Sequence, residues 1–211
     1  MAMVWPCPLP VDAYAAAGRD LVFPRPDCPS CAGPLVFWSG YRRHVRSASR
    51  CVRIFIPRVR CGPCRVTHAL LPAFTLAWRL DTAEVIGVVV AEVASGRCGV
   101  RPAAERAGVP YTTARGWMRR FAAGAPQIGA GFAALAVELG GPAITPPAGA
   151  ARFALAAIGA AFAAAAALPG WAGLGRWRFA SSAVGGMLIA ANTTSPFLVV
   201  GRRRFIPPVP P

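Results

Sequence analysis

The sequence predicts a mainly α-helical protein with a small β zinc ribbon, in which a helix-turn-helix unit of three helices is followed by Ala-rich C-terminal helices. Three observations lead to this fold class: two CxxC pairs around β-rich runs, glycine-punctuated helical segments after them, and many of the chain's 43 alanines in its C-terminal part. We expect a lead-in (1–24), a zinc ribbon (25–75), a helix-turn-helix domain (78–125) and a helical C-terminal region with a disordered tail (126–211).

Four cysteines form the ribbon signal. Cys28 and Cys31 make one CxxC pair, and Cys61 and Cys64 make a second pair 29 residues later. Zinc favours four such thiolates in a tetrahedron, and a hairpin of LVFW (35–38) and CVRIFIPRVR (51–60) between two knuckles makes a zinc ribbon. The alternatives are four reduced core cysteines or a redox dithiol. His68 is expected to be structural rather than a ligand, because four thiolates already complete the shell.

Three cysteines lie outside the two CxxC pairs. Cys7, Cys51 and Cys98 are interpreted as small apolar residues.

The net charge is +15, all 23 basic residues are arginine, and residues 28–65 contain eight arginines and no acid. GC-rich codons explain arginine over lysine but not the shortage of acids, so we expect a polyanion partner, double-stranded DNA, with phosphate contacts from Arg42, Arg43 and Arg46.

The helical segment begins at a capping box. Asp81 is expected to cap a helix with Glu84 three positions on, and Gly96 is a natural end. A short helix follows over about 101–107, Gly108 ends it, and a third helix runs from Tyr111 to Ala123. We predict that Ala104, Val109, Ala114 and Trp117 face inward, as in a helix-turn-helix.

The opposite face of the third helix is expected to read DNA. Arginine can fork onto guanine, and threonine can contact a base edge or a thymine methyl group. The alternative is a generic three-helix packing with a solvated arginine face. The candidate DNA contacts on this helix are Tyr111, Thr112, Arg115, Arg119 and Arg120, with Gly116 on the same face.

Three stretches carry a family resemblance: CPSCAGPL, RCGPCRVTHALLP and ERAGVPYTTARGWMRRF. They resemble zinc-ribbon plus helix-turn-helix proteins of unknown function from high-GC bacteria, which are related to the N-terminal DNA-binding region of insertion-sequence transposases. The resemblance covers about residues 25–125. It implies that Cys28, Cys31, Cys61 and Cys64 bind zinc and that the helix from Tyr111 to Arg120 touches DNA.

The acids argue against an enzyme. Transposase chemistry uses about three carboxylates to hold two divalent metals, and Glu138 is the one acid after residue 105. Tyr111 and the pair Ser181–Ser182 lack a recognisable base, so nucleophilic catalysis is not expected either. We therefore predict a binding protein, a transcriptional regulator or a non-catalytic transposase-related protein, with no small-molecule substrate.

The apolar C-terminal third leaves a second hypothesis open. Residues 153–168 are uncharged but are mostly alanine and stop at Pro169-Gly170, so a buried or interfacial helix is favoured over a membrane span, which needs about 20 apolar residues. A membrane-tethered zinc-binding regulatory protein is the alternative. The first residues, MAMVWPCPLP, show no signal-peptide pattern, and we expect a cytoplasmic protein with reduced thiols.

Overall fold

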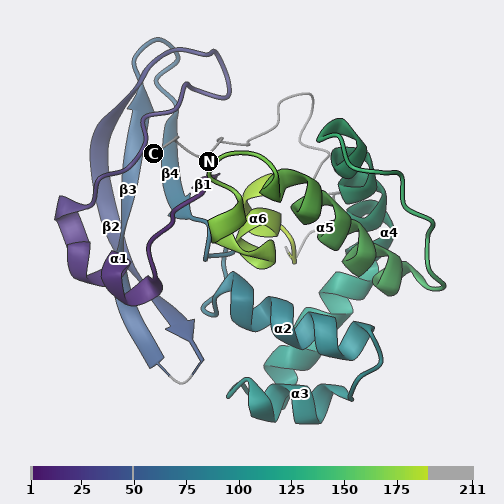
Figure 1. Cartoon of the computed structure of the whole chain (residues 1–211). Coiled ribbons are helices and arrows are strands. Elements are labelled where there is room, and N and C mark those ends of the chain that lie inside the picture. The colour runs from purple at the N-terminus through teal and green to yellow at the C-terminus, as the bar shows by residue number, and fades with distance from the viewer. Residues whose placement is uncertain (1, 49, 190–211) are drawn as a thin grey trace.

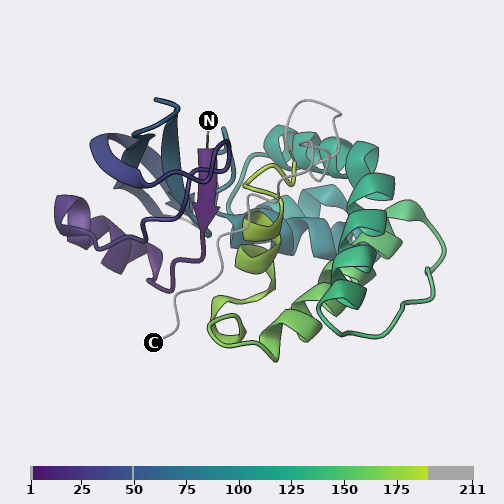
Figure 2. The same cartoon turned by 90° about the horizontal axis from the view of Figure 1, so that it is seen from above.

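The computed structural model describes residues 2–48 and 50–189. In this part of the chain, four strands and six α-helices form two bodies that lie side by side (Figure 1). Seen from above, the sheet and α1 lie at one end of the molecule and the helices α2–α6 at the other (Figure 2). A mainly helical chain with a β-hairpin between the cysteine pairs is thus confirmed, although the sheet is larger than a ribbon alone.

The sheet has the strand order β1-β4-β3-β2. The long hairpin of β2 (Leu35–Ser47) and β3 (Arg50–Cys61) is antiparallel, β4 (Thr67–Pro72) pairs with β3, and β1 (Ala2–Trp5) pairs in parallel with β4. Strand β1 lies in the stretch expected to be a lead-in. Four residues followed by a proline carry too little periodicity to reveal a strand, and each pairs with a residue 67 positions further along the sequence.

Among the residues that the structure describes, one α-helix precedes the β2–β3 hairpin in the sequence, and five follow β4. The helices are α1 (Val11–Ala17), α2 (Ala83–Ala94), α3 (Val100–Arg106), α4 (Tyr111–Glu138), α5 (Ala150–Ala166) and α6 (Arg176–Ala183), with 3₁₀ turns at Gly18–Asp20 and Ala172–Leu174. The expected Ala-rich helix is α5. It buries one stripe that contains Ala154, Ala157, Ile158, Ala161 and Ala165.

Helix α4 differs from its prediction. We expected the third helix to end at Ala123, but a single helix of 28 residues continues to Glu138. The buried positions Phe121, Ala125, Ile128 and Phe132 stay in helical phase across Pro126, so packing continues through the proline. Pro126 itself is exposed, where water can satisfy the carbonyl group that loses its partner.

The start of α2 also differs from its prediction. Thr82, not Asp81, is the N-cap, and its Oγ1 accepts a hydrogen bond from the backbone N–H of Val85 at 3.4 Å. Asp81 instead pairs with Arg46 of β2. The expected glycine ends are confirmed, because Gly96 and Gly108 have φ of 79° and 64° and each follows the C-cap residue of its helix, α2 or α3.

Each body has its own apolar core. The first lies around the sheet and takes residues from Met3 to Phe74, and the second takes residues from Leu76 to Ile189 and is built by the helices. Tyr14 of α1 is fully buried in the first core, where its hydroxyl donates to the carbonyl of Phe55 at 3.0 Å and its ring stands edge-on to Phe74. The N-terminal residues are therefore part of the sheet's core.

The membrane hypothesis concerned the Ala-rich segment. Within residues 2–48 and 50–189, no helix has the length and apolar character needed to cross a membrane. Helix α5 packs against α4, and Gly129 permits this because a Cβ there would lie 2.6 Å from the ring of Phe153. The tail RRRFIPPVPP (202–211), which we expected to be disordered, lies outside the described residues.

Candidate metal centre and basic helix face

The two CxxC pairs meet at one end of the β2–β3 hairpin. Cys28 and Cys31 lie in the loop before β2, while Cys61 ends β3 and Cys64 follows it. All four Sγ atoms lie within 4.8 Å of one another, and the two closest pairs are Cys31–Cys61 at 3.4 Å and Cys28–Cys64 at 3.6 Å. In the described part of the chain, this is the group of side chains that could bind a metal ion.

Both knuckles have the same backbone hydrogen bonds. The N–H of Ala32 donates to the carbonyl of Cys28 at 2.8 Å, and the N–H of Arg65 donates to the carbonyl of Cys61 at 3.1 Å. Ala32 and Arg65 both have positive φ, 57° and 63°. This left-handed residue after each CxxC closes the turn and places both sulfurs of the pair on one side.

Glycine allows the knuckles to approach closely. A Cβ on Gly33 would lie 2.9 Å from Pro63 and 3.3 Å from the Sγ of Cys61. Any larger residue would therefore push the second knuckle away from the first. The close contact between the two CxxC turns therefore requires glycine at position 33.

The thiols of Cys28 and Cys61 differ strongly in pKa. Burial raises the pKa of the Cys28 thiol, but hydrogen bonds from the backbone of Ser30 and Cys31 and from the side chains of His68 and Cys64 outweigh burial and lower the pKa to about 6. The backbone N–H of Cys64 lowers the pKa of Cys61, but burial and its neighbouring thiols raise it to about 12. One thiolate therefore forms readily, whereas further ones need a cation to offset their mutual repulsion.

His68 lies beneath the cluster. It is fully buried on β4, and its Nε2 is 3.6 Å from the Sγ of Cys28. Its Nδ1 has no hydrogen-bond partner among the described residues. His68 is not a member of the four-cysteine group, so the structure places it as a neighbour that contacts one thiol.

The three remaining cysteines differ in burial and in their contacts. Cys7 is buried, as expected for a small apolar residue. Cys98 is half-buried but has polar partners, because its Sγ accepts a hydrogen bond from Arg106 at 2.9 Å and lies 3.7 Å from a carboxylate oxygen of Glu92. Cys51 lies exposed near the start of β3, contrary to that interpretation. Cys51 is thus a thiol on the same hairpin that takes no part in the cluster.

The helices α2, α3 and α4 pack against one another. The residues expected on the inner face are buried: Ala104 at 1%, Val109 at 7%, Ala114 at 0% and Trp117 at 3% exposure. Helix α3 ends at Arg106 with Ala107 as its C-cap, and the three residues Gly108 to Pro110 then lead to the start of α4 at Tyr111. Glu92 of α2 pairs with Arg106 of α3 at 2.6 Å and fastens the first two helices together.

The outer face of α4 carries most of the predicted DNA contacts at the surface. Tyr111, Thr112, Arg115 and Arg119 are exposed, and the guanidinium of Arg101 lies over the Tyr111 ring at 5.0 Å. Arg120 is half-buried and donates to the carbonyl of Gly116 at 3.1 Å. Gly116 is half-buried on the same turn.

The predicted phosphate contacts on β2 have different surroundings. Arg42 is exposed. Arg43 is half-buried and donates to the carbonyls of Leu76 and Arg79, and Arg46 forms a two-pronged pair with Asp81 at 2.6 and 3.1 Å. Arg43 and Arg46 therefore tie the hairpin to the segment that leads into α2, a role that charge clustering in the sequence did not reveal.

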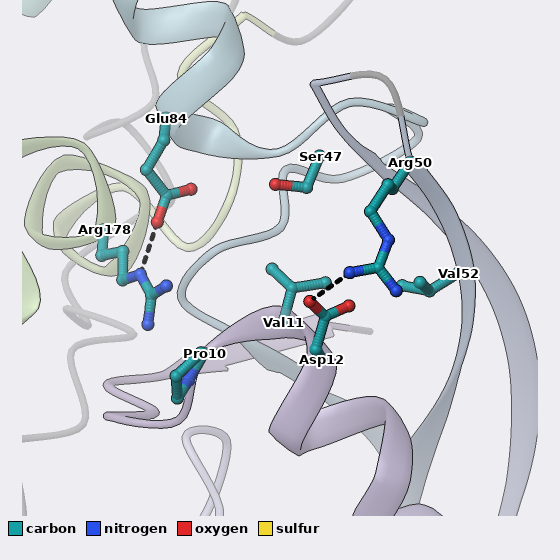
Figure 3. A pocket seen from close by; sticks show the side chains of 8 residues that line it. All are labelled: Pro10, Val11, Asp12, Ser47, Arg50, Val52, Glu84 and Arg178. Carbon is teal, nitrogen blue, oxygen red and sulfur yellow. Dashed lines mark hydrogen bonds and ion pairs between the residues drawn. The ribbon is translucent and has the colours of Figure 1, made fainter.

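A pocket of about 340 Å³ with four charged side chains in its lining lies near the other end of the hairpin, where the two bodies meet (Figure 3). Arg50 pairs with Asp12 on one side of it, and Arg178 pairs with Glu84 on the other. Arg178 also donates to the carbonyls of Cys7 and Leu9. The charged groups of this pocket are thus already paired, and Arg178 joins α6 to both α2 and the N-terminal segment.

The architecture is that of a protein with a candidate metal-binding hairpin joined to a helical body. Within it, residues 28–107 match the model of a family described as Domain of unknown function (DUF6431). The match spans the four cysteines, the sheet hairpin, α2 and α3, and it carries no link to transposases or to a group of bacteria. No curated protein and no solved structure gives a significant match.

Proposed function

We propose that the chain is a DNA-binding protein whose ribbon is held by one structural zinc ion. The four-cysteine geometry supports the metal. A tetrahedron with zinc–sulfur bonds of about 2.3 Å has sulfur–sulfur edges of about 3.8 Å, close to the 3.4 and 3.6 Å of the nearest pairs. Four thiolates with no open position define a structural rather than a catalytic ion.

The single observation that carries DNA binding is the exposed start of α4. Its first three turns contain no acid, and Tyr111, Thr112, Arg115 and Arg119 project from a helix that is held by buried contacts to α2 and α3. In a helix-turn-helix, the recognition helix follows a short turn, and α4 follows a short turn with Gly108 after α3. We propose that this face enters the major groove.

The hairpin supplies the second part of the contact. Arg42, Arg53 and Arg58 are exposed on β2 and β3, and such side chains bind phosphates without reading sequence. Among the predicted phosphate contacts, Arg42 carries this role best, because Arg43 and Arg46 have intramolecular partners.

We propose a regulator or a non-catalytic relative of transposases rather than an enzyme. Four carboxylates, those of Asp12, Asp81, Glu84 and Glu92, are engaged in ion pairs with arginine. An acid held by a guanidinium is a poor ligand for a catalytic divalent ion, which supports a binding role.

The metal is tested by measuring zinc per chain in protein purified without chelators. We expect one equivalent, and Cys61→Ser is expected to lose it. Cys51→Ser is the matched control, since Cys51 lies on the same hairpin but is exposed and outside the cluster. Full zinc content in Cys61→Ser would refute the ligand set.

DNA binding is tested by fluorescence anisotropy with a labelled duplex. Arg115→Ala and Arg119→Ala should each lose about 1–3 kcal/mol on a selected site if they contact bases. Arg152→Ala is the control, because Arg152 is an exposed arginine on α5. Equal losses from all three variants would leave only a general charge effect and refute a reading role for α4.

A further inference from the structure

An aromatic and basic patch lies on the hairpin near the knuckles. Val36 and Trp38 of β2 are 53% and 56% exposed, and the guanidinium of Arg60 lies over the Trp38 ring at 4.7 Å. Val36 of β2 is paired with Arg60 of β3, and Arg58 lies on β3 two residues before Arg60. These four residues are called the Trp38 patch.

The exposure of these side chains requires an explanation. Strand β2 is at the edge of the four-stranded sheet, and natural edge strands avoid flat apolar surface because it promotes aggregation. The register shifts between Phe37 and Ser39, so Trp38 is the extra residue of a β-bulge. Bulges re-aim side chains, and this one presents an indole to solvent beside a guanidinium.

The charge around the patch selects the partner. Residues 28–65 hold eight arginines and no acid, and among the described residues neither Arg58 nor Arg60 forms an ion pair. The fitting ligand must therefore offer both negative charge and a flat apolar face. Single-stranded nucleic acid offers a phosphate and an unstacked base in each nucleotide, whereas a duplex hides its base faces by stacking.

We propose that the Trp38 patch binds single-stranded nucleic acid, with an unpaired base stacked against the Trp38–Arg60 pair and phosphates held by Arg58 and Arg60. The surface belongs to β2 and β3, not to α4, and goes beyond the duplex binding proposed above. It would let the protein hold an opened strand beside a duplex.

The test uses the full-length, metal-loaded chain and a labelled oligothymidine of about 20 nucleotides. Trp38→Leu keeps apolar bulk but loses the aromatic face, and it should weaken binding by about 5- to 150-fold, the range of one base–aromatic stack. Trp38→Phe should retain most of the affinity. Arg58→Ala should reduce the slope of log K against log salt by about 0.7.

Trp78→Leu is the matched control, since Trp78 is 75% exposed but lies on the loop before α2. Equal affinities of Trp38→Leu, Trp78→Leu and the wild type for the oligonucleotide would overturn the proposal. A change from dimer to monomer in Trp38→Leu without loss of oligonucleotide binding would also overturn it, because the patch would then serve a second copy of the chain.

A parallel titration with duplex DNA separates the two proposals. Arg115→Ala is expected to weaken duplex binding and leave oligothymidine binding within about twofold of the wild type. Two results together would support the Trp38 patch and refute the major-groove proposal. The wild type would bind the oligothymidine but not the duplex, and Trp38→Leu would lose binding to the oligothymidine.

Discussion

The pair between Arg46 and Asp81 joins the β2–β3 hairpin to the start of α2, and the effect of removing it on stability can be predicted. Both Asp81 oxygens are engaged, at 2.6 and 3.1 Å, and the side chains of Arg46 and Asp81 are 24% and 4% exposed. Breaking a buried pair by removing one partner costs about 3–5 kcal/mol because a charge is left unpaired. Arg46 is partly hydrated, so Asp81→Ala should lower the free energy of unfolding by about 3 kcal/mol.

The assay is urea denaturation of the metal-loaded protein, followed by circular dichroism. The double variant Arg46→Met with Asp81→Leu leaves no unpaired charge and should lie within about 1 kcal/mol of the wild type. The backbone hydrogen bonds of Arg46 with Leu80 and Thr82 remain in every variant, so the strand stays docked. A loss below about 1 kcal/mol in Asp81→Ala would refute the inference that this pair holds the bodies together.

Three further predictions concern the helices and the metal. A hydrogen bond from Arg106 lowers the pKa of Glu92 in the folded protein. The stability that this pair adds is therefore fully present above the unfolded pKa of about 4.3 and is lost as the pH falls through the lower folded pKa. The difference in thermal midpoint between the wild type and Glu92→Gln should shrink over that pH range. Gly87→Ala should cost about 1–3 kcal/mol in urea unfolding despite a better helix propensity, because the new Cβ would lie 2.0 Å from the Trp177 ring. Chelation of the metal should lower the thermal midpoint of the wild type, and an unchanged midpoint would contradict a structural ion.

Local signals in the sequence predicted much of the site. CxxC spacing identified the four cysteines that the structure brings together, and the glycine positions marked the ends of α2 and α3. These features depend on neighbours within a few residues, where turn geometry is decided. The predicted inner face of the third helix is buried for the same reason, since helical periodicity fixes which residues share a side.

Long-range contacts account for what the sequence left hidden. Strand β1 exists because of its pairing with β4, and the arginine run on β2 divides into one exposed side chain and two that bind distant carbonyl and carboxylate groups. Asp81 resembled an N-cap because its spacing to Glu84 fits a capping box, but a partner 35 residues earlier in the chain outweighed that local role. The continuity of α4 through Pro126 likewise depends on packing against α5.

The account is tested most directly by the salt dependence of duplex binding by the zinc-loaded chain. Three phosphate contacts, from the exposed Arg42, Arg53 and Arg58, give a slope of about −2.7 in log K against log salt, or about 40-fold tighter binding on dilution from about 200 to about 50 mM salt. We predict this tightening in the wild type and a slope shallower by about 1.8 in the Arg42→Ala, Arg53→Ala double variant. Zinc-loaded, folded protein that does not bind duplex DNA at about 50 mM salt would contradict the account.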